Sequence, residues 1–381
     1  MNRKQALIAF GLLAILALAG AAVVVSERSS WGPADSRAGR KVAPGLRISD
    51  VAEIAIRDAA GEIHLVRGKV EWTVAERAGF EADTNRVAGL LVKLAELKIV
   101  QSEPLPGDQR ARFDLVVPEG KDAARPGTLL ELKDAKGGTL ARLLLGKKVL
   151  KGGAPASNAP GEAEASGRYL TAGGDGGTLL AVAEPLAEVE SRPDLWLSKD
   201  LVRAEGAKSI ASSRDGKPRW RVTRESESAD WKFSGSGQKP DLQKATDLAS
   251  SMGWINLVDV VADPLRVDTG LDHAVVVTAE TFDGLSYTLR IGRPAGDNYY
   301  VKVAVAGEPR KTRTPAKNEK AEDRAKADKE FEERRKKLVE RLERERKLDR
   351  WVYLVAKNAM APLLRDRPGL LPEKKTAAKK G

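Results

Sequence analysis

The apolar and polar positions of this chain form three kinds of pattern, and the first is a long apolar run. From Ala6 to Val25 the sequence contains no charged or strongly polar residue. A helix of that length spans roughly 30 Å of hydrocarbon. Arg3 and Lys4 precede the run, so the positive-inside rule places the N-terminus in the cytoplasm and the rest outside. We therefore expect residues 1–25 to form a single-pass inner-membrane anchor, with the bulk of the chain in the periplasm.

A cleaved signal peptide is the alternative, because the small residues of Ala17–Ala21 are suited to cleavage. The apolar run continues to Val25, beyond that point, and this favours an uncleaved anchor. Residues 26–44 are polar, contain Pro and Gly and show no periodicity. Such a composition is typical of a flexible linker.

The second pattern alternates apolar and polar residues, and it occurs twice. Asp50–Trp72 and Gly206–Trp231 each contain a short alternating run, a Gly turn, a second run and a closing Trp, as paired strands do. A helical stripe follows each time. It is formed in the first copy by Val87, Leu90, Leu91, Leu94 and Leu97, and more weakly in the second by Leu242, Ala245, Leu248 and Met252.

Four further strand-like runs follow each helix. Turn pairs such as Gly137-Gly138 and Asp283-Gly284 separate them and favour antiparallel hairpins. The pattern predicts an α+β fold with two tandem similar units, residues 45–198 and 199–372, each an antiparallel sheet with one main helix on a face.

The two copies also end alike. Val182–Leu197 and Val355–Leu371 both begin Val-Ala and later reach Arg-Pro. Because Pro disfavours helix in the residue before it, we expect Arg192-Pro193 and Arg367-Pro368 to end equivalent short helices.

The third pattern is a charged insertion, Pro309–Leu348, that only the second copy contains. From about Lys320 it consists of strong helix formers. The pairs Glu332 and Lys336, Glu333 and Lys337, and Glu340 and Arg344 are spaced for i, i+4 contacts. Its apolar stripe is thin and comprises Phe331, Leu338, Leu342 and Leu348. We expect a long charged helix that projects as an arm.

Three interpretations of this arm remain open: a solvated excursion without a role, a partner-binding arm with a coiled-coil contact, or a surface for anionic lipid or nucleic acid. Both charge signs are interleaved, which argues against nucleic acid. The basic tail, residues 373–381, is expected to be disordered.

Composition narrows the class of protein. The chain has 381 residues, enough for two domains, and no Cys. Disulfides, thiolate nucleophiles and Cys-ligated metals are therefore excluded. The formal net charge of +11 is modest beside a charged fraction of 31%, so it permits attraction to anionic surfaces without requiring it.

Familiar catalytic motifs are missing from the sequence. His64 and His273 fall in separate copies, and Asp263, Asp268 and Asp272 lack the Gly and Glu of a calcium loop. Neither a P-loop nor a Gly-x-Ser-x-Gly elbow occurs. We expect no enzymatic activity, no catalytic residue, no metal site and no cofactor.

Candidate binding residues are few. Tyr299 and Tyr300 are adjacent in a strand and so face opposite sides, which makes one a core residue and the other a candidate surface aromatic. On the arm the candidates are Phe331, Leu338 and Leu342.

Several short motifs carry a resemblance. The second copy has Trp231, "GLD" at Gly270–Asp272, "LRIG" at Leu289–Gly292 and "YYVKV" at Tyr299–Val303. The first copy has Trp72, "ADTNRVAGLLVKL" at Ala82–Leu94 and "LLLG" at Leu143–Gly146, but "RFD" at Arg112–Asp114 in place of "GLD", and an insertion at Gly152–Gly167. With these motifs the chain resembles, over roughly Leu46–Leu371, two tandem copies of the uncharacterised bacterial family domain of unknown function 4340.

The resemblance implies no established activity. Some members of the family look like auxiliary components of ABC-type transport systems linked to gliding motility, which implies an accessory role in the cell envelope. We expect a membrane-anchored, non-enzymatic periplasmic protein that binds other envelope or inner-membrane proteins and no nucleic acid. One alternative is a small-molecule or glycan binding module that uses a cleft between the two copies. A weaker alternative is an envelope hydrolase built on carboxylates.

Overall fold

The computed structural model describes residues 37–118, 126–150, 165–173, 177–313 and 320–373. The predicted anchor, residues 1–25, lies outside the described residues, as do most of the linker, the insertion after Gly152 up to residue 164, and residues 374–381 of the tail. Within the described ranges, no helix is both long enough and apolar enough to cross a membrane.

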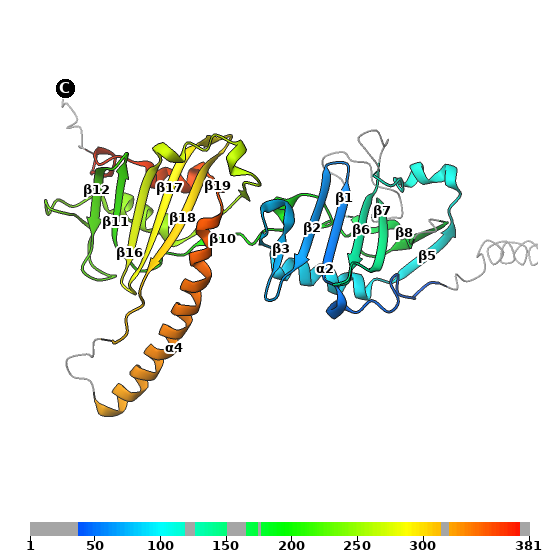
Figure 1. Ribbon diagram of the computed structural model, residues 1–381, viewed down its shortest axis with the longest axis horizontal. Coiled ribbons are helices and arrows are strands. Elements are labelled where there is room, and N and C mark those ends of the chain that lie inside the picture. The colour runs from blue at the N-terminus through cyan, green and yellow to red at the C-terminus, as the bar shows by residue number, and fades with distance from the viewer. Residues whose placement is uncertain (1–36, 119–125, 151–164, 174–176, 314–319, 374–381) are drawn as a thin grey trace, which may run out of the picture. The chain divides into compact units, whose positions relative to one another are not determined.

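The described residues have an α+β fold, as the sequence predicts. The chain divides into two compact units, one drawn chiefly from residues before Arg192 and one chiefly from residues after Ser191. The strands form two large sheets (Figure 1). Residues 63–87, which include β3 and β4 of the first sheet, are grouped with the second unit.

The first sheet has nine strands in the order β4-β3-β2-β1-β6-β7-β8-β9-β5. Neighbours from β1 through β6, β7, β8 and β9 to β5 pair antiparallel. The strands are β1 Glu53–Asp58, β2 Gly61–Arg67, β3 Trp72–Val74, β4 Phe80–Glu81, β5 Ile99–Pro104, β6 Thr128–Lys133, β7 Thr139–Leu150, β8 Ala165–Ala172 and β9 Thr178–Val182.

Helix α2, Thr84–Glu96, packs on this sheet. Asp83 caps it, because its Oδ1 accepts hydrogen bonds from the backbone N–H groups of Asn85 and Arg86 at 3.0 and 3.1 Å. All members of the predicted stripe are buried, at 3% exposure or less: Val87, Leu90, Leu91, Leu94 and Leu97. The helical periodicity therefore identified the core-facing side of α2 correctly.

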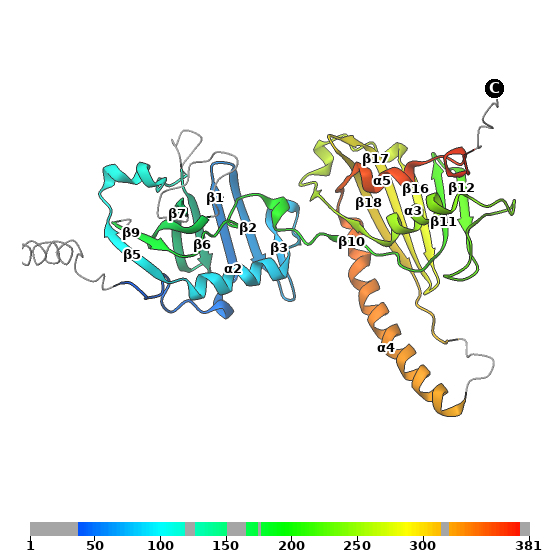
Figure 2. The ribbon, with the colours of Figure 1, turned by 180° about the vertical axis from the view of Figure 1, so that it is seen from behind.

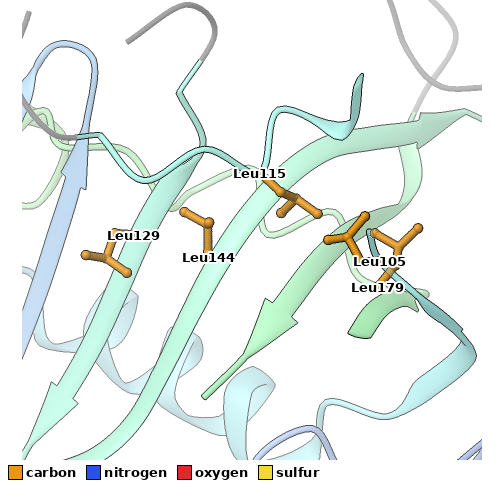
Figure 3. Packing of buried hydrophobic residues seen from close by; sticks show 5 residues of the cluster. All are labelled: Leu105, Leu115, Leu129, Leu144 and Leu179. Atoms are coloured by element: carbon orange, nitrogen blue, oxygen red, sulfur yellow. The ribbon is translucent and has the colours of Figure 1, made fainter. Parts of the chain in front are cut away.

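The opposite face of the first sheet is covered by the chain around the 3-10 helix η3, Gly107–Phe113. Figure 3 shows the small cluster that joins them, with the leucines on one side of the strands and a helix on the other. The cluster comprises Leu105, Leu115, Leu129, Leu144 and Leu179, with Phe113, Val117 and Tyr169 packed beside it. This loop gives the first sheet a second apolar layer.

The second sheet has eight strands in the order β13-β12-β11-β16-β17-β18-β19-β15. They are β11 Ala207–Arg214, β12 Lys217–Thr223, β13 Lys232–Phe233, β15 Asp259–Val260, β16 Val275–Thr281, β17 Leu285–Ala295, β18 Asn298–Gly307 and β19 Tyr353–Ala356. A separate two-stranded sheet pairs β10, Asp200–Val202, with β14, Ile255–Asn256.

Three α-helices accompany the second sheet. Helices α3, Leu242–Gly253, and α5, Lys357–Leu364, contact each other and lie on one face (Figure 2). Asp241 caps α3 by accepting a hydrogen bond from the backbone N–H of Lys244 at 3.1 Å. The third helix, α4, Ala321–Glu345, continues into the 3-10 helix η7, Arg346–Arg350.

The two sheets share one strand order. Eight strands of the first sheet match the eight strands of the second sheet, so that every two neighbours in one sheet correspond to two neighbours in the other. The matched strands are β1 and β11, β2 and β12, β3 and β13, β5 and β15, β6 and β16, β7 and β17, β8 and β18, and β9 and β19. Strand β4 is the additional strand of the first sheet. The tryptophans that close the matching segments, Trp72 and Trp231, are both buried core residues.

A glycine at matching places lets a loop backbone approach each sheet. A Cβ on Gly146 would lie 2.2 Å from the carbonyl oxygen of Phe113, and a Cβ on Gly292 would lie 2.2 Å from that of Thr269. Real side chains do not tolerate so short a contact, so only Gly fits here. This close approach of the loop explains why the motifs "LLLG" and "LRIG" both end in glycine.

This match corrects one alignment made from the sequence. Asp114 and Gly270 each follow the approaching carbonyl, and both have left-handed φ angles, 54° and 62°. Asp114 therefore corresponds to Gly270 and not to Asp272, so the alignment of "RFD" with "GLD" was wrong by two residues. Asp is among the few residue types that adopt this conformation readily.

Two further expectations need correction. Pro193 and Pro368 begin 3-10 turns, η4 (Pro193–Leu195) and η8 (Pro368–Leu370), and do not end helices. Proline suits a first helical position because its missing N–H would have no partner there. In the first of these two segments, the described residues from Val182 to Arg192 contain no helix.

The predicted linker boundary was also wrong. Gly39 N–H donates to the carbonyl of Ile99, and Val42 N–H donates to the carbonyl of Leu97, each at 2.8 Å. Val42 is buried. The folded part of the chain therefore begins before residue 45, because these residues pair with the segment that follows α2.

Candidate functional site

Helix α4 occupies the connection between β18 and β19. In the first sheet the corresponding strands, β8 and β9, are separated only by residues 173–177. In Figures 1 and 2 the helix runs past the ends of the second sheet's strands. Its 25 residues extend about 37 Å at 1.5 Å per residue. We call its last turns the root of the arm, residues 338–345, and the remainder its outer part.

A buried polar network fixes the root. The hydroxyl of Tyr287, on β17, donates a hydrogen bond of 2.8 Å to Oε2 of Glu345. Nε of Arg341 donates to Oε1 of the same carboxylate at 2.8 Å, and its Nη2 donates to the Tyr287 hydroxyl oxygen at 3.0 Å. The three groups therefore satisfy one another, and each carboxylate oxygen has a donor.

Burial makes this network strong. Tyr287 is 1% exposed and Glu345 is 9% exposed. Arg341 also donates to the backbone carbonyl of Arg203, just after β10. Leu342, at 4% exposure, packs beside these groups on the same helix. Removing one partner from such a network leaves a buried group unpaired, which costs more than the bond itself contributes.

The ionisation states follow from the surroundings. Burial, with Glu345 adding its negative charge, raises the pKa of Tyr287 above its ordinary value of 10.0, so the phenol stays protonated and donates. Burial by itself lowers the pKa of Arg341, but the hydrogen bond that it donates to Glu345 and the charges of its partners raise it overall. The result is a neutral phenol beside a saturated ion pair. This arrangement holds the helix in place, and it offers no free base or nucleophile.

The outer part of α4 is held more lightly. Nε of Arg313 donates to Oδ1 of Asp328 at 2.6 Å, and its Nη2 donates to the carbonyl of Arg324 at 3.2 Å. Phe331 in the outer part and Leu338 at the start of the root are both half-buried. The apolar positions of the predicted stripe thus face the protein's own chain.

The rest of the helix surface is charged and exposed. Its exposed charged side chains carry both signs and comprise Asp323, Arg324, Lys326, Asp328, Lys329, Glu330, Glu332, Glu333, Arg334, Lys336, Lys337, Glu340, Glu343 and Arg344. We call this set the outer face. It contains no large apolar residue, so it has no seam of the kind that a coiled coil requires.

The ion pairs on α4 differ from those predicted. Among the described residues, Glu332 pairs with Arg335 at 3.1 Å, and Arg341 pairs with Glu345 at 2.8 Å. The expected pairs of Glu332 with Lys336, Glu333 with Lys337 and Glu340 with Arg344 are not formed in this part of the chain. Exposed pairs of this type contribute only a few tenths of a kcal/mol, so either arrangement is accessible.

The sequence-predicted binding residues are not brought together. Tyr299 and Tyr300 are both half-buried and pair with Val355 and Leu354 of β19. They lie at the opposite end of β18 from Val305, the register partner of Tyr287. Of the arm candidates, Leu342 is a core residue of the root, which corrects its assignment as a contact residue.

Histidines and aspartates give no metal centre in the described residues. Nδ1 of His64 lies 2.8 Å from Oε1 of Glu76, and Nδ1 of His273 lies 3.1 Å from Oδ1 of Asp215. Asp263 and Asp268 form ion pairs with Arg266 and Arg293. Each of these groups thus has a local partner that explains its position.

Sequence reasoning missed the root network. Tyr287 lies 54 residues from Arg341 and 58 from Glu345, and nothing local marks these three among so many charged residues. The one available signal was Tyr at an inward position of an alternating strand, because a buried phenol requires a hydrogen-bond partner.

Comparison with known proteins identifies the family of this chain and gives no activity. The family model "Domain of unknown function (DUF4340)" matches residues 72–274, from Trp72 in β3 to the residue before β16. The match covers more than half of the chain, and the chain belongs to this family. No curated protein and no solved structure matches it.

Proposed function

We propose that this protein is a non-enzymatic, membrane-anchored accessory protein of the cell envelope that binds another envelope protein through the outer face of α4. The observation that carries the proposal is the contrast between the two sides of the helix. Its root is fixed by Tyr287, Arg341 and Glu345 in a buried network, while its outer face is exposed.

A fixed root favours binding because it holds the outer part in place before a partner arrives. Less conformational entropy is then lost on association. A helix of about 37 Å also gives reach beyond the sheet. A solvated excursion without a role would need neither a buried charge pair nor an aromatic hydrogen bond at its base.

The charges on the outer face favour a protein partner. Lysines and arginines alternate with glutamates along the helix, so the face has no large field of one sign. Nucleic acid and anionic lipid surfaces select for basic patches. A mixed face instead gives specificity by matching the charge pattern of another protein.

Three further parts of the proposal have their own support. The apolar run of residues 6–25 supports a membrane anchor and a periplasmic location. The common strand order of the two sheets supports an origin of the units as tandem copies of one module, with α4 as an insertion in the second. A transport or motility system is the partner that the sequence resemblance suggests.

Site-specific photocrosslinking in intact cells tests the binding surface. A photoreactive amino acid replaces Lys329, Lys336 or Glu340 of the full-length chain, and the matched control is Gln243, an exposed residue of α3. We expect one discrete adduct with an envelope protein from the α4 positions and none from Gln243. The charge reversal Glu332→Lys with Glu333→Lys should remove the adduct.

Two results would reject the binding surface: no adduct from any α4 position, or the same adduct from Gln243. The anchor is tested separately by alkaline extraction of membranes. The full-length chain should stay with the lipid fraction, and a chain that lacks residues 1–25 should not. If both extract alike, the anchor is wrong even where the crosslinks hold.

A further inference from the structure

Trp254 is an exposed aromatic residue beside the second sheet. It follows α3 directly and is 54% exposed. Of the other tryptophans in the described ranges, Trp72, Trp196, Trp220 and Trp231 are buried at 8% exposure or less, and Trp351 is half-buried. An indole left in water loses the burial energy that these other rings gain, so Trp254 is the tryptophan of the described ranges whose ring is most available to a ligand.

The backbone turns this ring outward. Trp254 is the residue after the end of α3 and has an extended conformation, with φ of −152°. The next residue, Ile255, is buried and pairs with Val202 of β10. Because side chains alternate along a strand, Asn256 lies on the same outward side as Trp254. Asp200 is the register partner of Asn256.

Polar groups hold the ring in one orientation. The indole Nε1 donates a hydrogen bond of 2.9 Å to Oδ1 of Asn256. The Arg203 guanidinium lies 4.3 Å from the ring centroid, and it forms an ion pair with Asp200. A cation stacked on an aromatic ring stabilises that arrangement. The Arg203 backbone is itself held by Arg341 of the arm root.

The chemistry around the ring is mixed and locally neutral. An amide, a carboxylate and a guanidinium lie within one small area, and the ion pair of Arg203 with Asp200 cancels their charges. The residues one turn earlier on α3, Ser250 and Ser251, are polar. A protein hot spot would instead sit inside a contiguous apolar patch with an outer polar rim. Along the same outward side the next exposed residue after Asn256 is the apolar Val258, so the apolar surface is small and polar groups border it. Such a surface favours a neutral, polyhydroxylated ligand.

We propose that Trp254, Asn256 and Asp200 form a binding platform for a hexopyranose ring of a glycan. The apolar C–H face of the sugar stacks on the exposed indole surface. The hydroxyl groups at the edge of the sugar bond to the amide N–H of Asn256 and to the carboxylate of Asp200, which fixes its orientation. This site does not depend on the protein-binding role of α4.

Ligand-observed saturation-transfer NMR on the full-length chain in detergent tests the platform. The probes are the neutral oligosaccharides cellotetraose and chitotetraose, at millimolar concentration. We expect transfer to the ring protons of at least one of them. Trp254→Ala should weaken binding by about tenfold or more, and Asn256→Ala should weaken it by a smaller factor.

The matched control is Leu242→Ala, which removes a 71% exposed apolar side chain from the other end of α3 and should leave binding unchanged. Thermal unfolding of each variant separates loss of binding from loss of fold, since Trp254 is mostly outside the core. The platform is rejected if neither oligosaccharide receives transfer, if Trp254→Ala binds as well as the parent, or if Leu242→Ala weakens binding equally. A protein adduct from a photocrosslinker at position 254, without saccharide binding, would assign the ring to a protein contact instead.

Discussion

The hydroxyl of Tyr287 lies 2.8 Å from Oε2 of Glu345, and this one bond joins the centre of the second sheet to the last turn of α4. Counting back from the matching glycines, Gly292 and Gly146, the residue of the first sheet that corresponds to Tyr287 is Ala141. The first sheet has no arm between β8 and β9. The phenol is thus present in the unit where a helix must be held.

Removing this hydroxyl should destabilise the second unit. In Tyr287→Phe the Glu345 carboxylate keeps Arg341 but loses its second donor while remaining buried. We expect the free energy of unfolding to fall by about 1–3 kcal/mol, measured by urea denaturation. Tyr300→Phe is the control, because Tyr300 is half-buried and its hydroxyl has no hydrogen bond within the described residues. Equal stability of Tyr287→Phe and the parent would mean that the network does not hold the root.

Hydrogen exchange should vary along α4. Amides near Leu342 and Glu345 belong to buried residues, whereas the early turns are held mainly by Arg313. Local opening requires less free energy where fewer buried contacts must break. We expect amides before Phe331 to exchange much faster than those from Leu338 to Glu345, as measured by mass spectrometry of peptides. Leu342→Ala should erase most of the difference, and uniform protection in the parent would contradict a fixed root with a freer outer part.

Two tyrosines should resist ionisation at alkaline pH. Burial raises the pKa of Tyr287 and of Tyr353 above the ordinary value of 10.0. The folded state therefore holds protons that the unfolded state releases once the pH passes 10. The stability that these phenols contribute is complete below about pH 10 and falls as the pH rises above it.

The check is a spectroscopic titration of tyrosinate absorbance. Tyr287 and Tyr353 should fail to ionise near pH 10, and their tyrosinate absorbance should appear only with unfolding. In Tyr287→Phe the absorbance that appears with unfolding should fall by the amount of one tyrosine. If no tyrosinate absorbance were gained on unfolding at this pH, the buried hydroxyls would be accessible to solvent in the folded protein.

Much of the fold could be predicted from local patterns. The stripe of α2 faces the core because apolar residues that recur about every 3.6 positions lie on one side of a helix. Helix α4, Ala321–Glu345, lies within the segment from Lys320 to Leu348 that is rich in strong helix formers and was predicted to be helical. Residues two apart in a strand share one face, so the apolar positions Tyr287, Leu289 and Ile291 of β17 indicate a core-facing side, and all three are buried.

Features that depend on contacts between distant segments could not be predicted. The hydrogen bond from Gly39 to Ile99 ties the predicted linker to the first sheet. Nothing in the sequence of residues 37–42 indicates this pairing. The arm root needs Arg341 and Glu345 to meet Tyr287, although many other Arg and Glu residues in the same helix have the same local spacing. The platform at Trp254 arises because this one residue separates α3 from β14, so that Ile255 turns inward and its neighbours Trp254 and Asn256 turn outward.

The glycines that admit a loop backbone give the most direct test of the match between the two sheets. In Gly146→Ala and in Gly292→Ala the new Cβ would lie 2.2 Å from a backbone oxygen, of Phe113 and of Thr269 respectively. Each loop must move, so we expect each variant to lose about 1–3 kcal/mol of unfolding free energy in denaturant titrations. The control is Gly89→Ala in the exposed surface of α2, where a Cβ meets nothing within 4 Å. It should stabilise the protein by about 0.5–1 kcal/mol, because alanine favours the helix over glycine. If either strand glycine accepts alanine without loss while Gly89→Ala behaves as expected, the close approach at that sheet is wrong, and with it the correspondence of Asp114 with Gly270.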